Sequence, residues 1–114
     1  MPETIREMVK AIQREVRDTP DLQPDRAADV LNHLTAMIGN CNDELRHADL
    51  EYKRVLLACL QSNVAANRAR IEAETSPEYV RRQEAAHTKE LVIELIRSLK
   101  VFLKSKTEEM RLSR

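Results

Sequence analysis

The stretch that decides the fold runs from residue 31 to residue 73 and reads LNHLTAMIGNCNDELRHADLEYKRVLLACLQSNVAANRARIEA. Within it, small and apolar residues recur every three or four positions without losing phase, which places them along one side of an α-helix. We call this set the seam, and its members are Leu31, Leu34, Ile38, Cys41, Leu45, Ala48, Tyr52, Val55, Cys59, Ser62, Ala66, Ala69 and Ala73. This spacing is typical of left-handed helix pairing, so the seam predicts a long helix that packs against a partner helix.

Composition also favours a helical protein. The chain has 114 residues, of which 33% are charged and only 3% are aromatic, and it contains a single glycine. A β-sheet would need more β-branched and aromatic residues and more turns. The length indicates one domain. Because the chain has so few aromatic side chains, it has little bulk for a large core, and we expect it to gain stability by forming oligomers.

Prolines mark the predicted boundaries. A leading helix is expected in residues 1–17, where Ile5, Met8, Val9, Ile12 and Val16 form one apolar stripe, and a linker with Pro20 and Pro24 follows over residues 18–24. The seam predicts a long helix over residues 25–74. A break at Gly39 is the alternative. The polar residues at positions 61–63 are expected to weaken this helix without turning the chain.

A return helix is predicted over residues 77–110. Thr75 and Glu78 have the spacing of a capping box, and Pro77 suits the first helical turn. A short connection over residues 73–76 would fold this helix back on the long helix. The predicted fold class is therefore all-α: a long antiparallel helical hairpin with a short N-terminal helix, coiled-coil-like and assembling into a helical bundle.

More apolar positions occur than one hairpin can bury. Leu57, Val64 and Ile71 form a second line on the long helix, and Ile96, Leu103 and Met110 form another on the return helix. Two hairpins in a four-helix bundle would bury both lines, although a trimer or ring is also possible. The residues expected to hold the oligomer together are Leu31, Leu34, Ile38, Cys41, Leu45, Tyr52, Val55 and Cys59 on the long helix, with Leu95, Leu99 and Phe102 on the return helix.

The sequence contains no pattern that indicates catalysis. It has no Cys-x-x-Cys pair, glycine-rich phosphate loop or serine elbow, and His33, His47 and His87 lack the spacing of a metal site within one helix. Cys41 and Cys59 are interpreted as packed thiols, because both lie on the seam. We therefore expect a protein that is not an enzyme and that needs no metal or cofactor.

A row of basic residues is the best candidate for a binding surface. Arg97, Lys100, Lys104 and Arg111 fall on one face of the return helix, opposite its apolar side. Such a row could follow the phosphates of single-stranded nucleic acid, although the chain has no net charge and no aromatic residues alternate with the row. The alternative interpretation is a solvated face, or charge pairing with a neighbouring helix.

A second candidate lies at the predicted tip of the hairpin. Asn63, Asn67 and Arg70 align along one helix face, and Arg68, Arg81 and Arg82 are near in sequence. Arginine offers a fork of donors to phosphate oxygens, so copies of this group in an oligomer could hold a small anionic nucleotide. Ordinary pairing with nearby glutamates would explain the same residues.

Residues 65–114 resemble small helical proteins encoded by bacteriophages and prophages. The resemblance is carried by Asn67-Arg68-Ala69-Arg70, Ser76-Pro77-Glu78-Tyr79, Ile96-Arg97-Ser98-Leu99-Lys100 and Lys106-Thr107-Glu108-Glu109-Met110-Arg111. It implies an accessory role in a phage, beside recombination or replication genes or against host defence. It supplies no catalytic residue.

The sequence as a whole predicts a homo-oligomeric helical protein that acts by binding. Its partners would be further copies of itself and, as alternatives, another protein, a small nucleotide or single-stranded nucleic acid. No apolar run approaches the roughly 20 residues of a membrane-spanning helix, so a cytoplasmic location without membrane association is expected, in a bacterial host if a phage encodes the chain.

Overall fold

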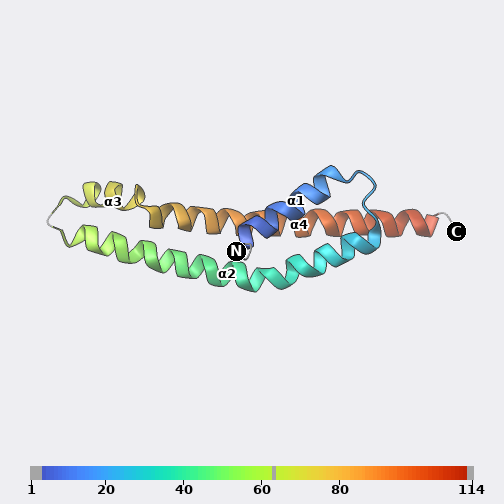
Figure 1. Ribbon diagram of the computed structural model, residues 1–114, viewed down its shortest axis with the longest axis horizontal. Helices are drawn as coiled ribbons and strands as arrows, with labels where there is room; N and C mark the ends of the chain where they lie inside the picture. Colours follow the sequence, from blue (N-terminus) through green and yellow to red (C-terminus); the bar gives the residue numbers. More distant parts are fainter. Residues whose placement is uncertain (1–3, 63, 113–114) are drawn as a thin grey trace. The chain divides into compact units, whose positions relative to one another are not determined.

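The computed structural model describes residues 4–62 and 64–112, and it confirms the all-α helical hairpin. The described residues form four helices, α1 (Ile5–Asp18), α2 (Pro24–Leu60), α3 (Ala66–Glu74) and α4 (Pro77–Leu112) (Figure 1). Helices α2 and α4 run antiparallel. The chain divides into two compact units, unit 1 (Met1–Asn40 with Glu90–Arg114) and unit 2 (Cys41–Lys89).

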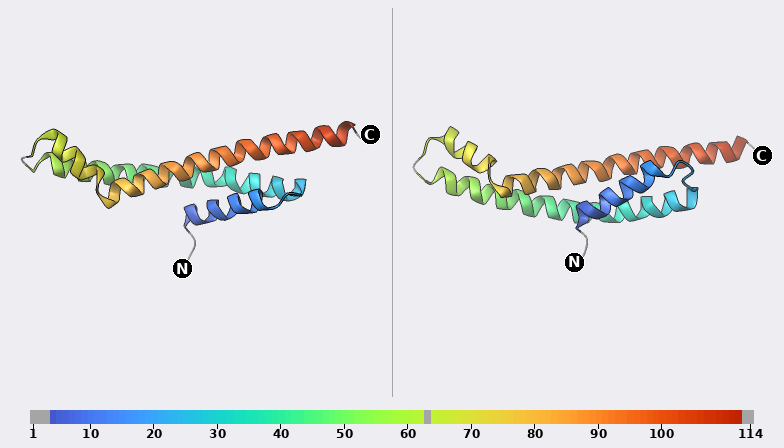
Figure 2. Two further views of the ribbon diagram at one scale, coloured as in Figure 1. Left: turned by 90° about the horizontal axis from the view of Figure 1, so that it is seen from above. Right: turned by 45° about the horizontal axis from the view of Figure 1, so that its top comes forward.

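Helix α1 begins at a complete capping box. The hydroxyl of Thr4 accepts a hydrogen bond from the backbone N–H of Glu7 at 3.1 Å, and the Glu7 carboxylate accepts one from the backbone N–H of Thr4. These two bonds satisfy donors that the first helical turn leaves without partners. The helix ends before the linker that contains Pro20, and it lies beside the first part of α2 (Figure 2). The predicted leading helix and linker are thus confirmed to within a residue or two over the described part.

Large apolar side chains form the core of unit 1. Its three helical segments come from α1, from the first half of α2 and from the last two thirds of α4. The buried residues are Val9, Leu22, Ala27, Val30, Leu34, Met37, Val92, Leu95 and Leu99. Each buried leucine or valine of this kind contributes about 1.5–3 kcal/mol by leaving water, so unit 1 has an ordinary hydrophobic core.

Unit 2 is packed differently, because its buried side chains are small. They are Cys41, Ala48, Ala69, Ala73, Ala85 and Thr88. Small residues at an interface let two helix backbones approach closely, but they remove little apolar surface from water. Large apolar side chains of the same unit remain exposed. Unit 2 therefore gains less from burial than unit 1.

The predicted helix over residues 25–74 is wrong in one respect, since the chain turns where that helix was expected to continue. Helix α2 ends at Leu60, and the hydroxyl of Ser62 donates to the carbonyl of Cys59 at 2.6 Å and so satisfies a carbonyl of the last turn. Helix α3 then runs back along unit 2 (Figure 1). The hairpin tip thus lies between the end of α2 and the start of α3, rather than at residues 73–76. Gly39 lies inside α2, so the alternative break there does not occur.

The start of α4 also differs from the prediction, because Ser76 rather than Thr75 caps it. The Ser76 hydroxyl accepts from the backbone N–H of Tyr79 at 3.3 Å and donates to the carbonyl of Ala73 at 2.5 Å. Thr75 instead donates to the carbonyl of Glu72 and so helps to end α3. Pro77 occupies the first position of α4, as predicted. The Ser76 hydroxyl therefore hydrogen-bonds to the last turn of α3 and to the first turn of α4.

This junction allows a direct test by substitution. Ser76→Ala removes the cap and should lower the free energy of unfolding by about 1 kcal/mol. Thr75→Ala, the matched control, removes one exposed hydrogen bond and should cost less. Urea denaturation followed by circular dichroism measures both. If Thr75→Ala lowers the free energy of unfolding more than Ser76→Ala does, the assignment of Ser76 as the cap is wrong.

Candidate functional site

Charged residues connect α2 to α4 on the surface of unit 2. Asp49 of α2 accepts a hydrogen bond from the Arg82 Nε atom of α4 at 2.6 Å and pairs with Lys53 Nζ at 2.9 Å. The hydrogen bond from Lys53, followed by that from Arg82, holds the pKa of the Asp49 carboxyl below its ordinary value. Asp49 is thus kept as a carboxylate between two cations.

Two tyrosines pack beside this ion pair. The ring centroids of Tyr52 and Tyr79 are 5.1 Å apart, with the ring planes inclined by 48°. The Arg82 guanidinium carbon lies 5.6 Å from the centroid of the Tyr52 ring. Tilted aromatic pairs and cations near a ring face are both favourable contacts. These rings are the bulkiest side chains in a unit whose buried residues are small, and both remain half-exposed.

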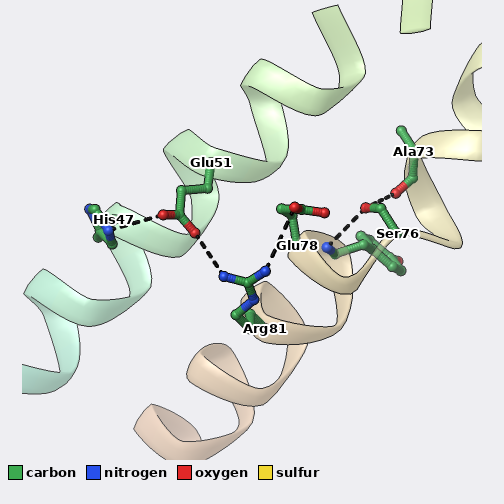
Figure 3. A network of polar contacts seen from close by, with 7 residues as sticks. His47, Glu51, Ala73, Ser76, Glu78 and Arg81 are labelled. Carbon is green, nitrogen blue, oxygen red and sulfur yellow. Dashed lines mark hydrogen bonds and ion pairs between the residues drawn. The ribbon is translucent and has the colours of Figure 1, made fainter. Parts of the chain in front are cut away.

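A second polar network lies near the start of α4 (Figure 3). The Glu51 carboxylate of α2 contacts His47 at 3.2 Å and the Arg81 guanidinium of α4 at 3.5 Å, and Arg81 also contacts Glu78 at 3.6 Å. In Figure 3, Arg81 points from α4 toward α2 and lies between the two glutamates. Ion pairs this exposed contribute at most about 1 kcal/mol each, so the network chiefly fixes the register of the two helices.

Each unit has a shallow groove between helices. In unit 2 a groove of about 390 Å³ has Leu45 and Ala86 in its lining, together with Asn42, Arg46, Asp49, Arg82 and Lys89. In unit 1 a groove of about 270 Å³ is lined by Met8, Ala11, Ile12, Glu15, Arg26 and His33. Arg26 bonds Glu15 through two nitrogens at 2.7 Å each, and this hydrogen bonding lowers the pKa of the Glu15 carboxyl. Within residues 4–62 and 64–112, no cluster of three or more histidine, cysteine or acidic side chains could hold a metal ion.

The seam packs mostly within the single chain. Leu34, Cys41, Leu95 and Leu99 are buried, so a second copy can reach them only if the hairpin opens. The other residues assigned to the oligomer contact are half-buried: Leu31, Ile38, Leu45, Tyr52, Val55, Cys59 and Phe102. Burial, and secondarily the nearby Glu44, raises the pKa of the Cys41 thiol, which keeps that thiol in its less reactive form. The seam therefore holds the helices of the hairpin together. A surface that could bind other copies must lie elsewhere on the chain.

Exposed apolar side chains follow the opposite side of α2 in unit 2. We call Leu50, Leu57 and Leu60 the outer stripe, and their exposed fractions are 48%, 55% and 46%. Leu57 was expected on a second apolar line with Ile71, but the chain turns between α2 and α3, so Ile71 lies on α3, where it is also exposed. Leu50 was missed, although it lies seven positions before Leu57 and so extends the predicted line toward the N-terminus.

The predicted basic row is present as a single exposed face of α4. Arg97, Lys100, Lys104 and Arg111 all lie on the solvent side of unit 1. None of the four forms an ion pair within the described part of the chain. The alternative of charge pairing inside the chain is therefore not observed. Glu90 and Glu94 occupy the same face toward the start of the helix.

The predicted tip site is only partly brought together. Asn67 and Arg70 are exposed on α3, one turn apart. Asn63 lies outside the residues that the structure describes. Arg68 pairs with Glu72 at 3.4 Å, while Arg81 and Arg82 are engaged by carboxylates of α2. Three of the arginines near this tip therefore already have acidic partners.

None of the described helices combines the length and the apolar character that a membrane span requires.

The lowered pKa of Asp49 predicts a pH-dependent effect of Asp49→Asn. A carboxyl whose pKa is lowered by folding stabilises the protein above its unfolded value of about 3.9, and that contribution disappears as the pH falls through the folded value. Because both cations are partly exposed, Asp49→Asn should cost roughly 0.5–1 kcal/mol at pH 7. The difference from the native chain should vanish in acid.

Chemical denaturation over a pH series measures this effect. Asp43→Asn is the matched control. Asp43 pairs with exposed Arg46 on its own helix, so this substitution should change stability little at any pH. Equal losses for the two variants, or a loss that is independent of pH, would show that the contact between α2 and α4 does not stabilise unit 2 as described.

No protein-family model, curated protein or solved structure matches this chain. The resemblance of residues 65–114 to small helical phage proteins therefore stays a prediction.

Proposed function

We propose that this protein acts by binding rather than by catalysis, as a homo-oligomeric helical adaptor whose copies associate through unit 2. The observation that carries the proposal is the outer stripe, which places three leucines on the surface of a unit that buries only small side chains. A surface of this kind costs free energy in water unless another apolar surface covers it.

A second copy is the partner that fits the outer stripe. Leu50 and Leu57 are seven positions apart and Leu60 follows three positions later, so the stripe runs along one straight side of a helix. The same side of α2 in another copy presents a matching row of leucines, which can interlock with the first as in a helical bundle. Small units commonly obtain by association the apolar burial that their own cores lack.

The assembled protein would present several copies of the same grooves and charged faces to further partners. This is the basis for calling it an adaptor, and an accessory role in a phage remains the proposed setting. Sequestration of a nucleotide is less well supported, because three of the arginines near the tip, Arg68, Arg81 and Arg82, already pair with carboxylates. Binding of single-stranded nucleic acid is supported by four exposed cations on α4 but opposed by the glutamates on the same face.

Light scattering of a double variant tests the proposal. The native chain should have at least twice the 13.2 kDa mass of one copy. Half-burial of a leucine contributes about 1 kcal/mol, and four such leucines, Leu50 and Leu57 from each of two copies, contribute about 4 kcal/mol. Leu50→Asp with Leu57→Asp should therefore raise the dissociation constant of this contact on the order of 1000-fold and lower the mass.

Leu112→Asp is the matched control, since Leu112 is 83% exposed in the last turn of α4 and lies outside unit 2. This variant should keep the native mass. A native chain with the mass of one copy would contradict self-association, and a double variant that keeps the native mass would contradict the outer stripe as the contact. Circular dichroism of each variant checks that the helices are retained.

A further inference from the structure

The solvent face of α4 in unit 1 carries charges that are separated by sign along the helix. Glu90 and Glu94 come first, and Arg97, Lys100 and Lys104 follow. At 3.6 residues per turn these five positions fall within an arc of about 120° on the helix. All five are exposed. The face, which we call the charged face, is therefore acidic in one half and basic in the other.

This separation is unfavourable for a lone helix. Glu90 and Glu94 are four positions apart, as are Lys100 and Lys104, and like charges at this spacing repel each other. None of the five side chains has an ion-pair partner among residues 4–62 and 64–112. By contrast, most of the ion pairs on α2 and α3 join opposite charges three or four positions apart. The charged face thus lacks the local pairing that the other helices have.

An apolar residue also lies in the middle of this face. Val101 is 69% exposed between Lys100 and Lys104, and Ile93 lies eight positions earlier on the same side of α4. A β-branched residue favours a helix less than alanine does, so an exposed valine here has no evident local benefit. Contact with another helix would give it one.

We propose that the charged face of α4 binds the charged face of a second copy in antiparallel orientation, about a two-fold axis near Arg97. In that orientation Glu90 lies opposite the second copy's Lys104, and Glu94 lies opposite its Lys100. The same register sets Ile93 against the second copy's Val101. Arg97 is one turn from Lys100 and so also faces the second copy's Glu94. Each glutamate and each lysine of the face then lies opposite a residue of the other sign, twice over by symmetry, while the two copies of Arg97 meet at the axis.

The acidic half of the charged face favours a second copy over a nucleic acid as its binding partner. A phosphate backbone laid along the face would gain from the cations but would meet Glu90 and Glu94 at close range, and the five residues together carry a charge of only +1. A second copy uses both halves. The inference rests on the proposed function in taking self-association as the setting. It adds a second contact, in unit 1, through which each copy binds a copy other than the one on its outer stripe, so the native mass exceeds that of a dimer.

Two charge-reversal variants test this contact. Glu90→Lys with Glu94→Lys makes the face wholly basic, and Lys100→Glu with Lys104→Glu makes most of it acidic. Both are made in a chain that also carries Leu50→Asp and Leu57→Asp, so that the outer stripe cannot hold the copies together. The parent chain should then be dimeric, each charge variant alone should be monomeric, and an equimolar mixture of the two should recover the dimer mass.

Salt provides an internal check on the mixture. The recovered dimer should dissociate as the salt concentration rises from about 0.05 M to about 0.5 M, because exposed charge pairs are screened over this range. Each variant should retain the helix content of the parent chain, since all four positions are exposed on α4. Light scattering and sedimentation velocity both report the masses.

The outcomes separate this contact from the proposed function. A monomeric parent chain, or a mixture that stays monomeric, would overturn the α4 contact, and neither result bears on the outer stripe. A native chain whose mass is unchanged by Leu50→Asp and Leu57→Asp would overturn the stripe and leave the α4 contact standing. The contact is likewise overturned if neither charge variant differs in mass from the parent chain, while a labelled single-stranded oligonucleotide binds the wholly basic variant more tightly than it binds the parent chain.

Discussion

Close packing of small side chains constrains the whole of unit 2. Ala69 and Ala73 of α3 and Ala85 of α4 are buried, and so are Cys41 and Ala48 on the facing side of α2. Because each of these inward positions holds few heavy side-chain atoms, their burial removes little apolar surface from water. The larger apolar side chains of this unit lie at the margins of the seam or on the outside. Leu50, Leu57 and Leu60 are exposed because they lie on the side of α2 opposite the seam.

Because burial contributes little in unit 2, directional contacts have a larger share in fixing its register. The Asp49–Arg82 bond, the Tyr52–Tyr79 pair and the Glu51–Arg81 contact all join α2 to α4. Each is weak by itself, yet all of them require the same alignment of the two helices. Unit 1 needs no such set, since Leu34, Val92 and Leu99 already fill its core. The two halves of one hairpin are thus stabilised in different ways.

Much of the fold follows from the sequence. The phase of the seam predicted the buried side of α2, and Pro24 and Pro77 predicted where two helices begin. The turn between α2 and α3 could not be predicted in the same way, because the spacing from Cys59 through Ser62 to Ala66 continues the seam without a break. The same repeat is expected from one continuous helix and from two successive helices whose apolar positions keep the same spacing, so it cannot distinguish the two structures. The cap at Ser76 was missed for a related reason, since Thr75 and Ser76 can both accept from a backbone N–H.

The candidate surfaces show the same limit. Arg97, Lys100 and Lys104 were assigned to one exposed face from their spacing alone, because such spacing depends only on the helix itself. The Asp49–Arg82 bond joins residues 33 positions apart, and its prediction requires the position of the turn. The outer stripe required knowledge of which residues fill the interior. Features within one helix were therefore predictable, whereas features that depend on the register between helices were not.

We propose that unit 2 obtains from other copies the apolar burial that its own core lacks. Amide hydrogen exchange at several protein concentrations tests it most directly, because protection from exchange reports the free energy of local opening. If the claim is correct, protection of the amides in α3 and in the second half of α2 will increase with protein concentration, while the core amides of unit 1 near Leu34 and Val92 will change little. Protection in unit 2 that equals that of unit 1 and is independent of concentration would contradict the claim.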